Sequence, residues 1–273
     1  MKKIVTMQDI SCVGKCSLTA ALPVISAMGI ETAVLPTAVL STHTMFRNPT
    51  FCDLSDQIEV ILDHWEENHF SFDAIYTGYL GSLRQMDLAR ELIFRFRKGP
   101  VLVDPCMADN GKLYAGFTNE FVDEMRNFCA EADIICPNLS EACFMLKIPY
   151  QEKPDEEMVR KILKDLTRIG CHTAILTGIS FNDTETGAYA YNRDTDTYTY
   201  VSAKKQKESF HGTGDLWASC FIGALVRGKS FEASLKLACQ FVSRSIELTL
   251  QEDNHNTYGV NFEQALPDLI RSL

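Results

Sequence analysis

The residues best suited to chemistry form a glycine-rich tetrapeptide, Gly212-Thr213-Gly214-Asp215, which stands directly before a small and apolar run. Glycines let a backbone turn sharply and approach a ligand closely. A helix that starts there would direct free N–H groups and the positive end of its dipole at a phosphate. Asp215 could then take a proton from an attacking alcohol. The chemistry indicated is transfer of a γ-phosphoryl group from a nucleotide to a small hydroxylated substrate, although a glycine turn with Asp215 as helix N-cap explains the same residues.

Further polar residues follow the predicted strands, at the sheet edge where open α/β proteins bind ligands. Asp104-Pro105 comes directly after a buried apolar strand, and Asp109 follows five residues later. Two carboxylates near the phosphates of a nucleotide suit a magnesium ion, held directly or through water. A proline turn with solvated acids is the alternative interpretation.

Two more turns repeat this placement. Asn138 and Glu141 follow the next predicted strand, and an amide with a carboxylate three residues on suits a metal and phosphate shell. The same spacing is also that of a helix capping box. Thr177-Gly178 follows a later strand and offers a hydroxyl and a close backbone approach, although a β-turn explains this pair equally well.

Short β-rich runs alternate along the chain with longer segments of helical period. This alternation predicts an α/β fold of three layers, α/β/α, with a mainly parallel central sheet. We expect a single domain over residues 1–273, since neither a repeat nor a linker interrupts the chain. The predicted strands are 3–7, 31–36, 74–77, 101–104, 134–136, 173–177, 187–192 and 197–201, the last two as an antiparallel hairpin. The predicted helices are 17–28 with a kink at Pro23, 55–64, 86–97, 120–130, 140–146, 155–169 and three more after the hairpin.

Composition narrows the classes of partner. The chain has 273 residues, of which 46% are hydrophobic and 23% charged, as in ordinary globular proteins. Its formal net charge of −10 would repel phosphate backbones and anionic lipid, so we expect neither nucleic acid nor a membrane as partner. An anionic substrate must therefore be held by local positive potential.

Ten cysteines are scattered along the chain, without a CxxC pair and without the histidine spacing of zinc sites. We interpret them as reduced thiols. The first residues contain no apolar stretch of signal-peptide length, and no segment is long enough to span a membrane. These features predict a cytoplasmic protein.

Taken together, the motifs resemble the pyridoxal kinase branch of the ribokinase-like vitamin kinases. The resemblance covers nearly the whole chain, and each motif follows a predicted strand or opens a helix. It therefore implies one ribokinase-like kinase domain. The segments that carry it are 17–29, which is similar to the first helix of that family; 37–44, similar to its Ser-Asn-His-Thr loop; Thr77-Gly78-Tyr79; Asp104-Pro105; Pro137-Asn138-x-x-Glu141; and the glycine motif.

The resemblance implies a kinase that uses ATP and Mg²⁺ to phosphorylate the hydroxymethyl group of a vitamin B6 vitamer. Asp215 would be the general base, and the N–H groups of Gly212, Thr213 and Gly214 would stabilise the charge of the transferred group. The ATP phosphates would lie near Asp104, Asn138 and Glu141, with Thr177 and Gly178 on the nucleotide side, and the Mg²⁺ near Asp104, Asp109 and Glu141. The family also suggests a homodimer, and it leaves a requirement for a monovalent cation open.

On the substrate side, the resemblance places Thr44 and Tyr79 against the vitamer ring, the threonine by a hydrogen bond and the tyrosine by packing or stacking. His43 is a secondary candidate that would orient Thr44; a purely structural histidine is the alternative.

The chain departs from the family after the first strand. Typical members have a Ser-His pair that helps to bind the pyridine, whereas this chain has Asp9-Ile10-Ser11-Cys12. Asp9 could prefer a cationic amine, as in pyridoxamine, or accept a hydrogen bond from an aminopyrimidine. A hydroxymethylpyrimidine kinase and a nucleotide-binding regulatory homologue with little turnover therefore stay open as alternatives.

Overall fold

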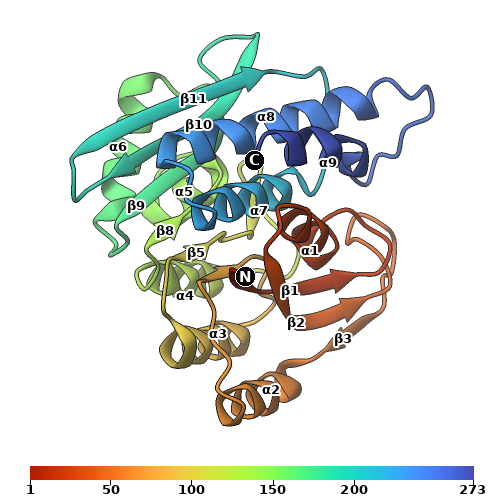
Figure 1. Ribbon diagram of the computed structural model, residues 1–273. Coiled ribbons are helices and arrows are strands. Elements are labelled where there is room, and N and C mark those ends of the chain that lie inside the picture. Colours follow the sequence, from red (N-terminus) through yellow and green to blue (C-terminus); the bar gives the residue numbers. More distant parts are fainter.

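The computed structural model describes residues 1–273, and its central element is a nine-stranded sheet (Figure 1). The strand order is β11-β10-β9-β8-β5-β4-β1-β2-β3. From β2 across to β9 all neighbours are parallel, whereas β3, β10 and β11 run antiparallel to the strands beside them. The bounds are β1 (Lys3–Ser11), β2 (Glu31–Leu40), β3 (Phe51–Asp53), β4 (Ala74–Thr77), β5 (Val101–Val103), β8 (Ile134–Ile135), β9 (Thr173–Ile179), β10 (Glu185–Asn192) and β11 (Thr197–Lys204). A separate hairpin contains β6 (Ala108–Asp109) and β7 (Lys112–Leu113).

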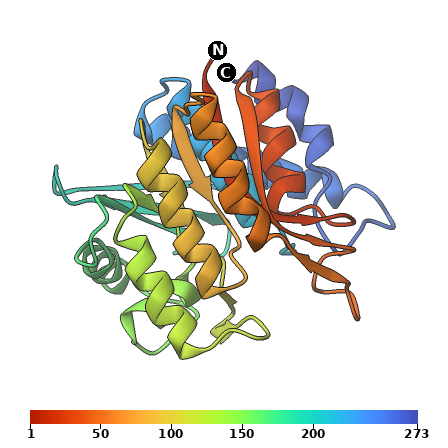
Figure 2. The same cartoon turned by 90° about the horizontal axis from the view of Figure 1, so that it is seen from below.

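Helices cover both faces of the sheet, which confirms the predicted three-layer α/β/α fold. One face carries α2 to α6, and Figure 2 shows α2, α3 and α4 next to one another on the near side. The other face carries α1, α7, α8 and α9. The bounds are α1 (Ser17–Ala27), α2 (Ser55–Glu67), α3 (Leu83–Phe96), α4 (Asn119–Cys129), α5 (Leu139–Leu146), α6 (Glu156–Thr167), α7 (Thr213–Val226), α8 (Phe231–Thr249) and α9 (Phe262–Arg271).

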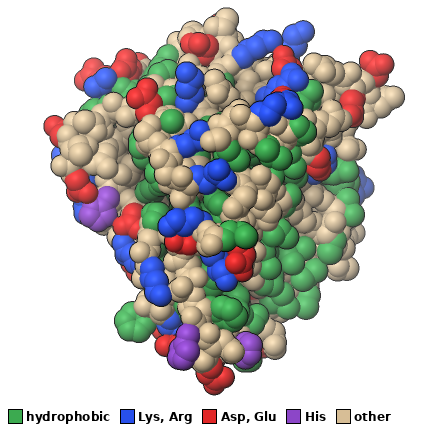
Figure 3. Space-filling view, in the orientation of Figure 1, with side chains coloured by type: hydrophobic (Ala, Val, Ile, Leu, Met, Phe, Trp, Pro, Cys, Tyr) green, Lys and Arg blue, Asp and Glu red, His purple; other side chains and the backbone are tan.

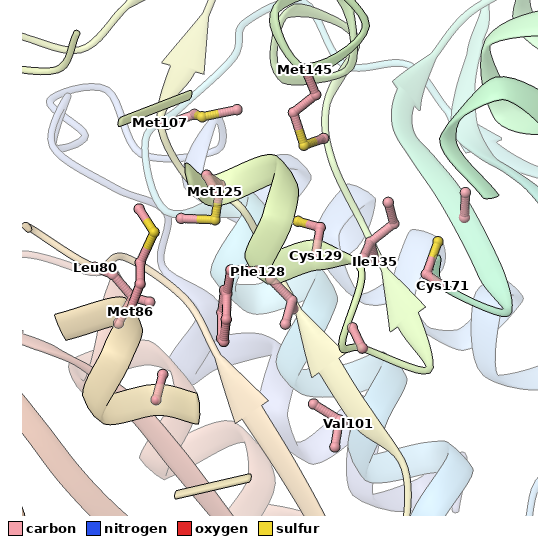
Figure 4. Packing of buried hydrophobic residues seen from close by; sticks show 14 of the residues in the cluster. Leu80, Met86, Val101, Met107, Met125, Phe128, Cys129, Ile135, Met145 and Cys171 are labelled. Atoms are coloured by element: carbon pink, nitrogen blue, oxygen red, sulfur yellow. The ribbon is translucent and has the colours of Figure 1, made fainter. Parts of the chain in front are cut away.

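Alternating strand residues supply the two hydrophobic cores between the layers. Val5 of β1 points to the α2–α6 side and Ile4 to the α7 side, as the two-residue period of a strand requires. Figure 4 shows part of the first core, including Val101 of β5, Phe128 of α4 and Ile135 of β8. None of the helices combines the length and the apolar character that crossing a membrane requires.

The first two strands are longer than the sequence predicts. β1 continues to Ser11 with an irregularity between Gln8 and Ile10, so Asp9 lies within the strand and not after it. β2 continues to Leu40 through Pro36. A proline is tolerated there because β3 pairs only with 38–40, which leaves one edge of β2 free at Pro36.

The helices agree more closely with expectation. α1 continues past Pro23 as one helix, and Gly29 follows its end with a φ of 74°. α7 begins at Thr213, directly at the glycine motif. The sequence therefore located the glycine turn at the start of this helix.

Candidate active site

The glycine motif forms the first turn of α7. Gly212 is the N-cap with a left-handed φ of 77°, and Thr213 is the first helical residue. A Cβ on Gly212 would lie 1.9 Å from the main-chain oxygen of Lys15, so only glycine fits between this turn and the start of α1. The unpaired N–H groups of the turn and the positive end of the helix dipole make the position suitable for an anion.

Asp215 lies in this turn as the third helical residue. It is not the N-cap, because Gly212 occupies that position. The side chain is buried, with Asp215 only 7% exposed, and its Oδ1 has no hydrogen-bond partner. Burial raises the pKa of Asp215 to about 7; the main-chain amide of Ser17 opposes that rise, and the charge of Asp9 adds to it. A carboxylate with such a pKa is well matched to proton abstraction near neutral pH.

Asp104 directly follows β5 and comes close to the same turn. Its Oδ2 lies 3.9 Å from the position that a Cβ on Gly214 would occupy. Burial, followed by the charges of Glu141 and Asp215, raises the pKa of Asp104 well above its usual range. The structure therefore brings Asp104 and the glycine motif together.

Asn138 and Glu141 form the capping box that the sequence offered as an alternative. Asn138 Oδ1 accepts from the Glu141 N–H at 3.0 Å, and Glu141 Oε2 accepts from the Asn138 N–H at 2.8 Å. Glu141 Oε1 also accepts from the Met107 N–H at 3.0 Å, while Asn138 Nδ2 donates to the Ala108 carbonyl at 2.8 Å. The pair thus ties the segment after Asp104 to the start of α5. Burial raises the pKa of Glu141 to about 7, although these main-chain N–H groups oppose the rise.

The acidic residues differ in how well they suit a metal ion. No three His, Cys, Asp or Glu side chains converge into a metal site. Both oxygens of Glu141 already receive N–H groups, and Asp109 is exposed on the β6–β7 hairpin, where it accepts from Asn110. Asp104 fits best, because a cation would relieve the repulsion between buried carboxylates. Such a site suits Mg²⁺, which usually takes one or two protein carboxylates together with substrate phosphates.

Thr177 and Gly178 lie on β9 beside Asn138. The Thr177 N–H donates to the Pro137 carbonyl at 3.1 Å, and Asn138 and Thr177 form an isolated parallel bridge. Gly178 has a left-handed φ of 71°, and no atom lies within 4 Å of the position of its missing Cβ. This end of β9 is therefore open to a ligand.

Asp9 on β1 and Tyr79 after β4 interact electrostatically. The Ser11 hydroxyl donates to Asp9 Oδ2 at 3.1 Å, and burial raises the pKa of Asp9. Burial, together with the charge of Asp9, also raises the pKa of Tyr79. The Tyr79 ring centroid lies 5.7 Å from that of Phe117.

The segment that resembles the Ser-Asn-His-Thr loop is strand up to Leu40 and turns only afterwards. Thr44 is exposed there. The ring of His43 lies 4.8 Å from the ring of His211, and burial, followed by the charge of His211, lowers the pKa of His43 to about 4. His211 directly precedes Gly212, so this contact brings the loop to the start of α7.

Two residues of the site were missed by the sequence reasoning. His211 precedes the motif, but nothing in the sequence indicated its histidine partner. Ser17 has a left-handed φ of 46° at the start of α1 and lies between Asp9 and Asp215, lowering the pKa of both carboxyls. A serine at a helix start is too common to be a signal of this role.

Comparison with known proteins identifies the family. Residues 14–260 match the phosphomethylpyrimidine kinase family, and the chain belongs to it. Over 275 residues it is 27% identical to the pyridoxal kinase PdxY of Pasteurella multocida, covering 93% of this chain and 92% of that protein. It is also 27% identical to the chloroplastic thiamine biosynthetic bifunctional enzyme TH1 of Arabidopsis thaliana over 84% of this chain, but it spans only 44% of that enzyme.

Solved structures agree with this assignment. A Bacteroides thetaiotaomicron protein described as a phosphomethylpyrimidine kinase, crystallised with pyridoxal, has a TM-score of 0.93 and 38% identity, over 98% of this chain and 95% of that one. The pyridoxal kinase of Lactobacillus plantarum has a TM-score of 0.91 and 30% identity, over 99% and 97%. The predicted membership of the ribokinase-like vitamin kinases is confirmed, and the chain is a phosphotransferase by family.

The close approach at Gly212 gives a testable prediction. Gly212→Ala should lower the free energy of unfolding by about 3 kcal/mol, because a Cβ would collide with the main chain of Lys15 and the residue would keep a left-handed φ. Gly228→Ala is the matched control, since Gly228 has a φ of 90° but open space around its missing Cβ. Gly228→Ala should lower the free energy of unfolding by only about 1 kcal/mol. If urea unfolding gave equal losses of unfolding free energy for the two variants, the contact with Lys15 would be unimportant.

Proposed function

We propose that this chain transfers the γ-phosphoryl group of ATP to the 5'-hydroxymethyl oxygen of a vitamin B6 vitamer, giving the 5'-phosphate and ADP. The observation that carries the proposal is the position of Asp215, a buried carboxylate with a pKa near 7 in the same helical turn as the N–H groups of the glycine motif. The similarity to a protein crystallised with pyridoxal supports the choice of vitamer.

In this mechanism Asp215 removes the proton of the hydroxymethyl group as its oxygen attacks the γ-phosphorus. The bond from phosphorus to the β–γ bridging oxygen breaks, and ADP leaves with that oxygen. The N–H groups of Gly212, Thr213 and Gly214 stabilise the negative charge of the group in transfer, and their fixed orientation lowers the barrier without reorganisation. Mg²⁺, held through Asp104, would neutralise charge on the phosphates.

The remaining candidate residues divide between the two substrates. Asn138 and Glu141 hold the segment after Asp104 in place, and Thr177 and Gly178 line the nucleotide side. Asp9, Thr44 and Tyr79 contact the vitamer in this proposal, with His43 as the residue that orients Thr44. Asp109, the remaining candidate for the metal, is exposed on the β6–β7 hairpin.

Hydroxymethylpyrimidine is the second candidate substrate. The family description and the thiamine-pathway relative favour it, and the Asp9 carboxylate can accept from an aminopyrimidine as well as bind a cationic amine. A regulatory protein without turnover is disfavoured because the general base is retained at position 215.

We further propose that residues 1–273 act as one kinase domain within a cytoplasmic homodimer that binds neither nucleic acid nor membrane. Its cysteines are free thiols, which suits a reducing compartment. Figure 3 shows hydrophobic side chains gathered over α1 and the β2–β3 end of the sheet. The exposed large hydrophobic residues of those segments include Leu22, Met45, Phe46 and Phe51, and such patches often mark interfaces.

Asp215→Ala tests the mechanism. It should lower turnover by roughly two to four orders of magnitude, the usual contribution of a general base, and leave ATP affinity nearly intact. ADP release measured with Mg-ATP and pyridoxal gives turnover, and titration calorimetry gives affinity. Asp87→Ala, which removes an exposed carboxylate on α3, is the control and should behave as wild type. Full activity in Asp215→Ala would refute the assignment of the base.

A substrate panel tests the role of Asp9. Wild-type protein and Asp9→Asn should be assayed with pyridoxal, pyridoxamine, pyridoxine and hydroxymethylpyrimidine. If Asp9 binds the amine, kcat/KM for pyridoxamine should fall about tenfold or more in Asp9→Asn, the scale of a charge-assisted hydrogen bond, while pyridoxine changes little. An equal effect on all four substrates would remove Asp9 as a determinant of specificity.

A further inference from the structure

Tyr76 has a fully buried hydroxyl group for which the structure provides no hydrogen-bond partner. It is 0% exposed and lies on β4, one residue before the Thr77-Gly78-Tyr79 motif. Buried hydroxyl groups in native proteins almost always have a partner, so an orphan of this kind requires an explanation.

The position of Tyr76 in the sheet places it on the face that α7 covers. Tyr76 belongs to the core on the α7 side, and α7 packs directly on β4. In the parallel pairing of β1 and β4 it is the partner of Thr6, which accepts a hydrogen bond from Gln8 Nε2 at 2.7 Å. Gln8 Oε1 and Asp215 Oδ1 are also buried without partners. The structure thus leaves an unpaired hydroxyl on β4 and an unpaired carboxylate oxygen on α7, the helix that packs on that strand.

The titratable groups around Tyr76 come from several elements and comprise two carboxyls and two thiols. Burial raises the pKa of Tyr76 well above its usual range, and among the charged groups Asp215 from α7 adds most to that rise. Its hydroxyl therefore keeps its proton and can only donate to a carboxylate. The facing groups are Asp215 on α7, Asp104 and Cys106 after β5, and Cys136 after β8.

We infer that Tyr76 is a positioning residue whose hydroxyl donates through one buried water to Oδ1 of Asp215. This inference rests on the proposed function. Held at Oδ1, the carboxylate presents Oδ2 to the alcohol whose proton it removes. The phenol itself does not contact substrate and neither gains nor loses a proton during transfer.

Tyr76→Phe removes only the hydroxyl and keeps the ring in the core. It should lower kcat by about 10- to 100-fold, the scale of a hydrogen bond to a charged group, with KM for ATP and for the vitamer unchanged. Tyr189→Phe is the matched control. Tyr189 is also a buried tyrosine, but its hydroxyl donates to Glu156 on α6 at 2.8 Å, so kcat should stay at the wild-type value.

The same substitution in an Asp215→Ala background separates positioning from a general structural effect. In the Asp215→Ala background, Tyr76→Phe should lower the residual kcat by less than twofold, because the carboxylate that the Tyr76 hydroxyl positions is absent. A single-variant kcat within twofold of wild type, an equal loss in both backgrounds, or loss of the native near-UV circular dichroism would each overturn the inference. Failure of wild-type protein to phosphorylate any vitamer or pyrimidine would instead refute the proposed function.

Discussion

The arrangement depends on the burial of several carboxylates at one edge of the sheet. Asp9, Asp104, Glu141 and Asp215 are all less than 9% exposed, and burial is the main cause of the raised pKa of each. Removing carboxylates from water and placing them near one another is unfavourable for folding. The fold retains them because other parts of the molecule, and the ligands we propose, compensate for their charge.

Each acid is compensated differently. Glu141 receives main-chain N–H groups from both ends of the segment that it joins, so its role is to hold that segment. Asp9 receives the Ser11 hydroxyl. Asp215 receives the main-chain N–H of Ser17 and Asp104 that of Cys106; in the mechanism that we propose, the proton of an alcohol and a cation compensate these two acids. This uneven compensation is the reason that we assign the chemistry to Asp104 and Asp215 and a structural role to Glu141.

The sequence was sufficient to predict the layered fold and the glycine turn at the start of α7. Both depend on local signals, namely alternating periods and a glycine motif before an apolar helix. It could not decide between a metal shell and a capping box at Asn138 and Glu141, because one spacing serves both; the structure contains the box. The extension of β1 past Asp9 and the contact of His43 with His211 depend on pairing between distant segments. A single sequence does not encode these pairings in any local pattern.

The most direct test of the account is the pH dependence of kcat/KM for the vitamer that the protein phosphorylates. Because burial raises the pKa of Asp215 to about 7, the base is protonated below that value and ionised above it. The account predicts that kcat/KM falls about tenfold for each pH unit below 7. A profile that stays level down to about pH 5, as an ordinary aspartate with a pKa near 4 would give, would contradict it.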